Sequence, residues 1–350
     1  MRIALIHNQF IRSGGMERYL FDLVVGFSGA GHDVTVICYK VDSPQPLSDL
    51  SRVIRYDFSL VPKPLRRFAF DKSVRKTLGS ESFDLTIALP EIQDADIAIC
   101  GGTHLAYLDY MQIDPSVLDR AQVKLESKSY QSAKTVVAHS PMLSEELQRL
   151  YGIPESQLKV ILPPTDTEQF QRQTEQQRTE SKKRFDIKDG VTSILLCSTG
   201  HHRKGLGPLL GAMKLLPTGE FELLVAGRQV DELNQPDAPT NVRALGYVTD
   251  MPALYNAVDI TALPALYEPF GLVAVESLQC GTPVLISKTV GAGAVVSDSE
   301  GVIINEITPQ EIADGILNLR DNPRDVHENF ASVKGLTLGS HIQALLGLHQ

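Results

Sequence analysis

Two carboxylates in the C-terminal half of the chain lie where their spacing could serve one ligand. The segment Glu268–Glu276 runs from a loop into a helix and carries an acidic residue at each end. The helix would begin near Phe270 and Gly271, where unpaired N–H groups and the positive end of the helix dipole favour a diphosphate or a sugar hydroxyl. At about 1.5 Å per residue, Glu276 lies roughly 9 Å further along. A carboxylate there can accept hydrogen bonds from both vicinal hydroxyls of a ribose.

Glu276 has two interpretations, a ligand-binding carboxylate or a solvated helix residue. Its neighbours Val273, Val275 and Leu278 indicate a largely buried helix. Because an unpaired carboxylate is costly in such surroundings, we favour the ligand-binding interpretation.

Two adjacent cations, Arg203 and Lys204, lie in the loop from Gly200 to Gly205, just after a predicted strand. A fixed Arg and Lys can neutralise negative charge that develops on a departing diphosphate, as a divalent metal would. The alternative is a solvated basic turn. His201 and His202 stand beside them, but no Cys or carboxylate has metal-ligand spacing, so we expect no metal ion.

The N-terminal half offers further candidate residues. Gly14 and Gly15 lie between the first predicted strand and a helix, where the backbone can approach a phosphate or a sugar. His104 follows another predicted strand and should face the ligand side of its sheet, or else it is a satisfied structural histidine. Asp94 and Asp96 mimic an Asp-x-Asp metal motif, but they precede a strand, and we interpret them as a strand-entry turn.

Short apolar runs alternate with segments of helical periodicity in both halves, which is typical of parallel sheets wound with crossover helices. In the first half we expect strands at 2–7, 34–39, 85–89, 97–100 and 135–138, and helices near 16–30, 64–78, 116–131 and 141–151. In the second half we expect strands at 193–198, 222–226, 242–245, 260–263, 283–286 and 301–304. Two such sheets facing each other would place a ligand in the cleft beyond their carboxyl ends.

A chain of 350 residues exceeds the usual size of one domain. The prolines at 163 and 164, followed by a polar stretch from 165 to 184, indicate a linker and a solvated helix. We therefore expect an N-terminal domain at 1–163, a C-terminal domain at 164–322, and helices at 323–350 that pack across the domain junction.

Composition narrows the class of protein. A net charge of −9 argues against broad nucleic-acid binding, so no nucleic-acid partner is expected. The four cysteines lie in or beside apolar runs, as reduced core residues of a cytoplasmic protein do. We find neither a signal peptide nor a stretch of roughly 20 apolar residues that could span a bilayer.

One basic segment, Lys63–Lys76, mixes cations with aromatic residues. It is either a surface that rests on an anionic membrane or the charged outer face of an amphipathic helix. The first interpretation would place the protein at the inner face of the plasma membrane.

The segment Glu268–Glu276 resembles the E-x7-E motif of the retaining glycosyltransferases of family 4. The loop that ends in Arg203-Lys204-Gly205 is similar to one in the lipopolysaccharide core glucosyltransferases that act on heptose, although family 4 usually sets its Arg and Lys several residues apart. Nearly the whole chain is covered, because further matching segments are Gly14-Gly15, 160–170, Gly246-Tyr247-Val248, Asp259, Pro264 and Gly281–Val284.

The resemblance implies the GT-B fold, in which two Rossmann-like domains face a central cleft. It also implies transfer of a hexosyl group from a nucleoside diphosphate sugar, with a UDP-sugar expected, to a glycan or a lipid-linked acceptor. Configuration would be retained, no cofactor or metal would be needed, and the product would belong to a bacterial lipopolysaccharide or envelope polysaccharide.

By the same analogy, Glu268 contacts the donor sugar, Glu276 contacts the ribose, and Arg203 and Lys204 stabilise the leaving diphosphate. His104 joins these as a catalytic candidate. The resemblance implies further donor contacts from Gly14, Gly15, Gly200, Tyr247, Phe270, Gly271 and Leu272.

Two other functions are compatible with the same architecture. A sugar-nucleotide epimerase would need acid and base residues around the sugar, and we identify none. An inactive sugar-nucleotide-binding protein is disfavoured because Arg203, Lys204, Glu268 and Glu276 are all present.

Overall fold

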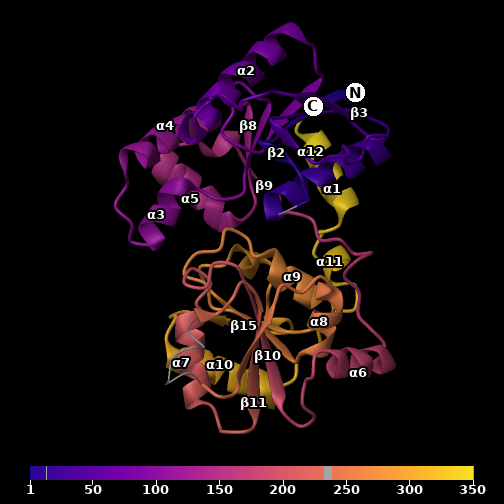
Figure 1. The fold of residues 1–350 in the computed structure, drawn as a ribbon, viewed down its shortest axis with the longest axis vertical. Helices are drawn as coiled ribbons and strands as arrows, with labels where there is room; N and C mark the ends of the chain where they lie inside the picture. Colours follow the sequence, from indigo (N-terminus) through magenta and orange to yellow (C-terminus); the bar gives the residue numbers. More distant parts are fainter. Residues whose placement is uncertain (13, 232–238, 350) are drawn as a thin grey trace. The chain divides into compact units, whose positions relative to one another are not determined.

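The computed structural model describes residues 1–12, 14–231 and 239–349. The chain forms two compact units, one of residues 1–164 with 338–350 and the other of residues 165–337 (Figure 1). Each unit contains a parallel sheet with helices on both faces. The expected α/β class, with two doubly wound Rossmann-like domains, is confirmed.

The first unit is built on a seven-stranded parallel sheet in the order β5-β3-β1-β6-β7-β8-β9. Its strands are β1 (Arg2–Ile6), β3 (Asp33–Cys38), β5 (Arg52–Arg55), β6 (Leu85–Ala88), β7 (Ile97–Cys100), β8 (Thr135–Ala138) and β9 (Leu158–Val160), and a small separate pair joins β2 (Gln9–Phe10) to β4 (Lys40–Val41). Its helices are α1 (Gly15–Gly29), α2 (Arg66–Ser80), α3 (His104–Tyr110), α4 (Val117–Ser132), α5 (Pro141–Tyr151) and α12 (Leu338–Gly347).

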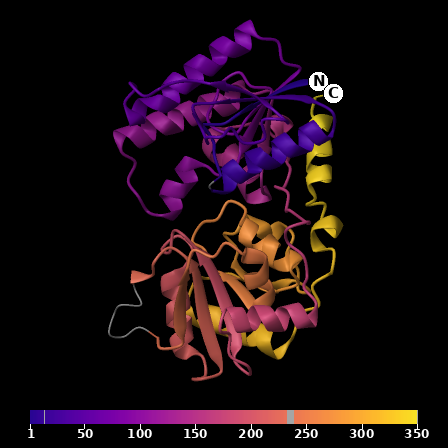
Figure 2. The same ribbon diagram turned by 45° about the vertical axis from the view of Figure 1, so that its right-hand side comes forward.

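The inner strands of this sheet are buried on both faces, so they are nearly continuous apolar runs rather than alternating ones. Along β1, Ile3 and Leu5 pack with α1 and α12, whereas Ala4 and Ile6 pack with α2. Figure 2 shows α12 lying beside α1, which closes the first of these two layers.

The second unit contains a six-stranded parallel sheet in the order β12-β11-β10-β13-β14-β15. Its strands are β10 (Thr192–Ser198), β11 (Phe221–Gly227), β12 (Val242–Gly246), β13 (Ile260–Leu263), β14 (Val284–Ser287) and β15 (Gly301–Ile304). Its helices are α6 (Glu175–Arg184), α7 (Leu206–Leu215), α8 (Met251–Ala257), α9 (Leu272–Gln279), α10 (Pro309–Asp321) and α11 (Phe330–Val333).

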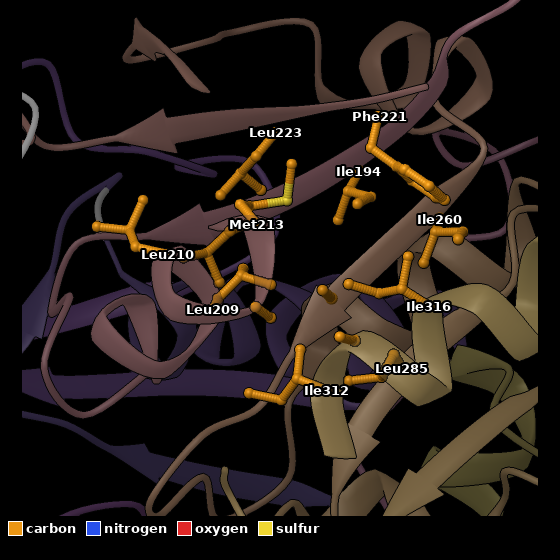
Figure 3. Close-up of a cluster of buried hydrophobic side chains, with 14 of the residues drawn as sticks. Ile194, Leu209, Leu210, Met213, Phe221, Leu223, Ile260, Leu285, Ile312 and Ile316 are labelled. Carbon is orange, nitrogen blue, oxygen red and sulfur yellow. The ribbon is translucent and has the colours of Figure 1, made fainter. Parts of the chain in front are cut away.

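The core of the second unit lies on both sides of its sheet. Figure 3 shows one side, where Leu209 and Met213 of α7 and Ile312 and Ile316 of α10 meet strand residues such as Ile194. The other side packs strand residues against α8 and the residues around it. These two layers fix the sheet whose strand ends carry the candidate site.

Some elements differ from the sequence-based expectation. The strands β5 and β9 were not predicted, because charged residues such as Arg52 and Lys159 interrupt their short apolar runs. The division expected from the sequence sets residues 323–350 apart as one segment. In the structure the second unit extends to residue 337, since Phe330 and Ala331 are fully buried and Ala331 N donates to Gln279 Oε1 at 2.8 Å.

Only the segment from residue 338 joins the first unit, so the chain passes between units at 164/165 and again at 337/338. Thr165 N donates to Leu336 O at 2.8 Å, which ties the two passages together. The expected packing of the C-terminal helices across the junction stays a prediction. No helix among the described residues combines the length and the apolar character that crossing a membrane requires.

Candidate functional site

The strands β10 and β13 are neighbours in the second sheet, at the point where the strand order reverses. The loop 199–205 leads from β10 to α7, and the loop 264–271 leads from β13 to α9. In open parallel sheets the crevice beyond such a switch point is the usual ligand site. The fold therefore brings the cation pair and the first carboxylate to the same strand ends.

One carboxylate oxygen of Glu268 meets both cations. Arg203 Nη1 donates to Glu268 Oε2 at 2.8 Å, and Lys204 Nζ lies 3.3 Å from the same oxygen. Arg203 Nη1 also donates to the carbonyl of Tyr267 at 2.7 Å. The side chains of Arg203, Lys204 and Glu268 are 28%, 12% and 14% exposed, so water screens their attraction less than at the surface. Two cations and one carboxylate leave one net positive charge in this cluster.

Gly205 allows the two loops to approach each other. Its φ of +77° lies in the left-handed region, and a Cβ added there would lie 1.9 Å from the carbonyl oxygen of Pro264. Leu266 N donates to Arg203 O at 2.8 Å, which fastens the loops together. Only glycine fits at this position without displacing the β13 loop.

The backbone of Glu268 is held by the segment that follows β14. Glu268 N donates to Thr289 O at 3.0 Å, and Gly291 N donates to Glu268 O at 2.9 Å. Gly271, with φ of +95°, then begins α9, and no side-chain hydrogen bond caps that helix. The first N–H groups of α9 therefore have no capping side chain, as an anion site at a helix start requires. Phe270 is buried and Leu272 is partly buried beside them.

Tyr255 contacts Glu276, a predicted site residue, and was not itself among the predicted residues. Its hydroxyl donates to Glu276 Oε2 at 3.0 Å, and its side chain is fully buried on α8. Burial raises the pKa of the Tyr255 hydroxyl well above its usual value, so this group stays a protonated donor. Glu276 thus has the polar partner that its apolar helix requires. A tyrosine within an apolar helix gives no sequence signal for this role.

Two further expected donor residues lie just beyond the ends of β12 and β10. Tyr247 follows β12, which is two strands from β10, and its side chain is 73% exposed. Gly200 opens the β10 loop, and its carbonyl accepts a hydrogen bond from Lys204 N at 3.1 Å. A Cβ at Gly200 would meet nothing within 4 Å, so the structure imposes no steric need for glycine there. The donor roles of both residues stay predictions.

The histidines of the β10 loop have structural contacts. His201 Nδ1 lies 2.9 Å from Ser198 Oγ, and its Nε2 lies 3.0 Å from the carbonyl of Gln229, so the ring links the ends of β10 and β11. Across the part of the chain that the structure describes, no group of three His, Cys, Asp or Glu side chains is placed to hold a metal ion. Asp94 and Asp96 precede β7, and Asp96 binds Thr86 and Lys134.

In the first unit, Gly14 and Gly15 lie at the switch point of their own sheet, after β1 and at the start of α1. A Cβ at Gly15 would meet nothing within 4 Å, and one at Gly14 would meet only Glu17 Oε2, at 3.0 Å. A ligand could therefore approach the backbone of Gly14 and Gly15 where other residues carry a side chain. Ser13, which precedes the pair in the sequence, lies outside the described residues.

His104 is the first residue of α3, and its ring is held by a carboxylate. Its Nε2 lies 2.8 Å from Asp119 Oδ1. Hydrogen bonds from Ser116 and then from His104 lower the pKa of Asp119 to about 2, so that the carboxylate is ionised at neutral pH. The pair orients the imidazole, and the catalytic role of His104 stays a prediction.

Comparisons with known proteins match both halves of the chain. Residues 13–169 match the family model described as Glycosyltransferase Family 4, and residues 177–332 match the one described as Glycosyl transferases group 1. A probable transglycosylase of Burkholderia thailandensis is 35% identical over 303 residues, which cover 87% of this chain and 82% of that protein.

Solved structures share the two-domain fold. WaaG, a glycosyltransferase involved in lipopolysaccharide biosynthesis, has a TM-score of 0.77 at 17% identity, over 98% of this chain and 94% of that one. HepE of Anabaena, solved with UDP-glucose, has a TM-score of 0.77 at 18% identity, over 99% and 98% of the two chains. At such identities the likeness shows the fold.

Proposed function

Because the chain belongs to the family 4 glycosyltransferases of the GT-B fold, we propose that it moves a hexosyl group from a UDP-sugar to a hydroxyl of a glycan or a lipid-linked acceptor, with retained configuration. The observation that carries the proposal is the cluster of Arg203, Lys204 and Glu268 at the switch point of the second sheet.

In this reaction the diphosphate leaving group lies against the loop 199–205 and the start of α9. Lys204 has three N–H donors, and its ammonium group forms an ion pair with Glu268. The other donors can meet phosphate oxygens as their charge grows. Arg203 is fixed by the Tyr267 carbonyl and by Glu268, so it needs little reorganisation during reaction.

The donor and the pathway are inferred from solved structures of the same fold. HepE of Anabaena was solved with UDP-glucose, and WaaG is involved in lipopolysaccharide biosynthesis. We therefore propose a UDP-sugar as donor and a bacterial envelope glycan as product. Thermal-shift screening of nucleoside diphosphates, followed by transfer assays with truncated glycans, tests both assignments.

Variants of three residues test the site. Glu276→Ala removes binding made equally in ground and transition states, so affinity for UDP should fall more than the single-turnover rate.

Lys204→Ala removes stabilisation of charge that develops as the glycosyl bond breaks, so the single-turnover rate of this variant should fall on the order of a hundredfold or more. Glu268→Ala should slow transfer and leave UDP affinity nearly intact, because UDP lacks the hexosyl group that Glu268 is expected to contact. Calorimetry with UDP and single-turnover rates are the measurements.

The matched control is Glu306→Ala, which removes an exposed carboxylate from the same unit and should change neither quantity. Equal losses of UDP affinity in Glu268→Ala and Glu276→Ala, together with a normal rate in Lys204→Ala, would contradict the assignment.

We further propose that the reaction needs no divalent metal, since Arg203 and Lys204 can supply the positive charge. Loss of transfer in EDTA, restored by magnesium or manganese, would contradict this.

Retention of the anomeric configuration is tested separately, by measuring the anomeric coupling constant of the first product with proton NMR.

We also propose that the segment Lys63–Lys76 rests on an anionic membrane. Leu60 and Leu65 flank Lys63 and are 96% and 53% exposed, which adds apolar contacts to the basic residues. Lys63, Lys72 and Lys76 are exposed, whereas Arg66 donates to the Val61 carbonyl. Changing the three lysines to Gln should weaken binding to anionic vesicles, and unchanged binding at low salt would contradict the proposal.

A further inference from the structure

A pocket with a volume of about 480 Å³ lies on the first unit beside α3 and α4. Its apolar lining comes from Leu105, Pro115 and Val123. Three cations, Arg120, Lys124 and Lys128, line the same pocket. The pocket therefore combines an apolar wall with a positive rim.

The three cations are spaced four residues apart on α4, so they lie on one face of the helix. Within the described residues, their side chains make no hydrogen bond or ion pair, and all three are exposed. Like charges at this spacing repel each other and weaken a helix. Among the residues that the structure describes, no ion pair offsets this repulsion, and a bound anion would do so.

The acidic residues of α4 are engaged elsewhere. Asp119 accepts from Ser116 and pairs with His104. Glu126 is buried, accepts hydrogen bonds from Tyr151 and from His104 N, and has a pKa raised to about 7 by burial. Neither carboxylate is available to neutralise the rim, although the whole chain carries a net charge of −9.

Apolar side chains are exposed at the start of the helix that carries the three cations. Val117 and Leu118 begin α4 with 80% and 57% of their surfaces exposed, and Ile113 precedes them at 44%. Together with the apolar wall, they suit a ligand that has an apolar part beside its anionic group. An amphiphilic phosphate has this combination, because Lys and Arg form charge-assisted hydrogen bonds with phosphate oxygens.

We propose that this pocket binds the phosphate of a lipid-linked acceptor, with the apolar wall in contact with the adjoining chain. Leu105 lines the pocket and directly follows His104, so the acceptor would be anchored one residue from a predicted catalytic side chain. The inference rests on the proposed function, and it specifies the acceptor as a phosphorylated amphiphile.

Decyl phosphate, used below the concentration at which it forms micelles, is the probe. Calorimetry should show binding to the wild-type protein and about tenfold or greater weakening in the double variant Lys124→Gln, Lys128→Gln, because two charge-assisted contacts are lost. The matched control is Lys183→Gln with Lys188→Gln, two exposed lysines of the second unit whose side chains make no hydrogen bond or ion pair with the described residues. Its affinity should equal that of the wild type. Far-ultraviolet circular dichroism checks that each variant is folded.

Two further ligands separate the parts of the probe. Inorganic phosphate alone and decanol alone should each bind more weakly than decyl phosphate. Equal affinity of decyl phosphate for the wild type and the Lys124, Lys128 variant would overturn the proposal. So would inorganic phosphate binding as tightly as decyl phosphate, since the apolar wall would then contribute nothing.

The test is independent of the donor site. UDP affinity measured on the same samples should be unchanged in the Lys124, Lys128 variant. Failure of the wild-type protein to bind UDP would count against the proposed function, whereas failure to bind decyl phosphate would count against the acceptor pocket alone.

Discussion

Glu276 depends on a buried neighbour for its orientation. The Tyr255 hydroxyl donates to it from α8, and the pKa of that hydroxyl is raised by burial, so the donor keeps its proton. Tyr255→Phe should weaken UDP binding about three- to tenfold, the usual range for one such hydrogen bond. The single-turnover rate at saturating donor should stay nearly constant, because the contact is the same in ground and transition states.

Calorimetry with UDP and single-turnover kinetics measure the two quantities. Tyr39→Phe is the control, since the Tyr39 hydroxyl has no hydrogen bond among the described residues. A rate loss in Tyr255→Phe with unchanged UDP affinity would show that Tyr255 does not act by positioning a ribose-binding carboxylate.

The residues of the charged cluster could be predicted from the sequence, whereas their supports could not. Arg203, Lys204 and Glu268 each follow a strand, and parallel strands end at one edge of a sheet. The contact of both cations with one Glu268 oxygen, and the bond from Arg203 to the Tyr267 carbonyl, depend on the paths of two loops. The hydrophobic periodicity of the sequence contains no information about those paths.

At the scale of elements, Gly205 couples the β10 loop to the β13 loop. Gly205→Ala places a methyl group against the Pro264 carbonyl and forces an L residue to φ of +77°. We expect it to lower the free energy of unfolding by more than about 1 kcal/mol, because a native conformation incompatible with the new residue outweighs its entropic gain. Gly205→Ala should also slow transfer, because displacing this loop moves Arg203 and Lys204, the two residues just before it.

Gly207→Ala provides the matched comparison, two residues further along. Gly207 lies in α7, is exposed, and a Cβ there would meet nothing within 4 Å. This variant should be neutral or more stable by up to about 1 kcal/mol, the difference between Ala and Gly in a helix. Urea unfolding followed by circular dichroism measures both, and similar stabilities would contradict the role of Gly205.

Strand prediction succeeded where an apolar run was uninterrupted. The expected strands at 97–100, 135–138, 260–263 and 301–304 have the observed bounds. The edge strand β5 has partly exposed residues, Arg52–Arg55, that look like a polar connection. The seven-residue helix α3 is also too short to show a helical period, although it carries His104 and lines the pocket through Leu105.

At the scale of the molecule, the C-terminal helix returns to the first unit. Leu345 of α12 is fully buried with the α1 core, and a Cβ at Gly26 would lie 2.5 Å from Ile342 Cγ1. The hydrogen bond between Tyr19 and His341 joins residues 322 positions apart. Sequence periodicity predicts a helix near the C-terminus. It does not indicate whether this helix packs on the first unit or on the second.

This returning helix makes the first unit sensitive to acid. His341 Nε2 lies 2.7 Å from the Tyr19 hydroxyl and its Nδ1 lies 2.9 Å from the Leu162 carbonyl, so the ring is neutral, with Nδ1 as donor. Burial lowers the pKa of His341 to about 4. The unfolded chain binds this proton near pH 6.5. The stabilisation is therefore complete above pH 6.5 and is lost as the pH falls from there to about 4.

For one such histidine, the free energy of unfolding should fall by about 2 kcal/mol between pH 7 and pH 5. His341→Gln loses the ring contacts and should be less stable at pH 7, yet its stability should fall by about 2 kcal/mol less over the same interval. His349→Gln, which changes an exposed histidine just after the same helix, should keep the wild-type pH dependence. Urea unfolding at the two pH values measures all three proteins, and an equal loss in wild type and His341→Gln would show that the neutral His341 ring does not couple the packing of α12 to pH.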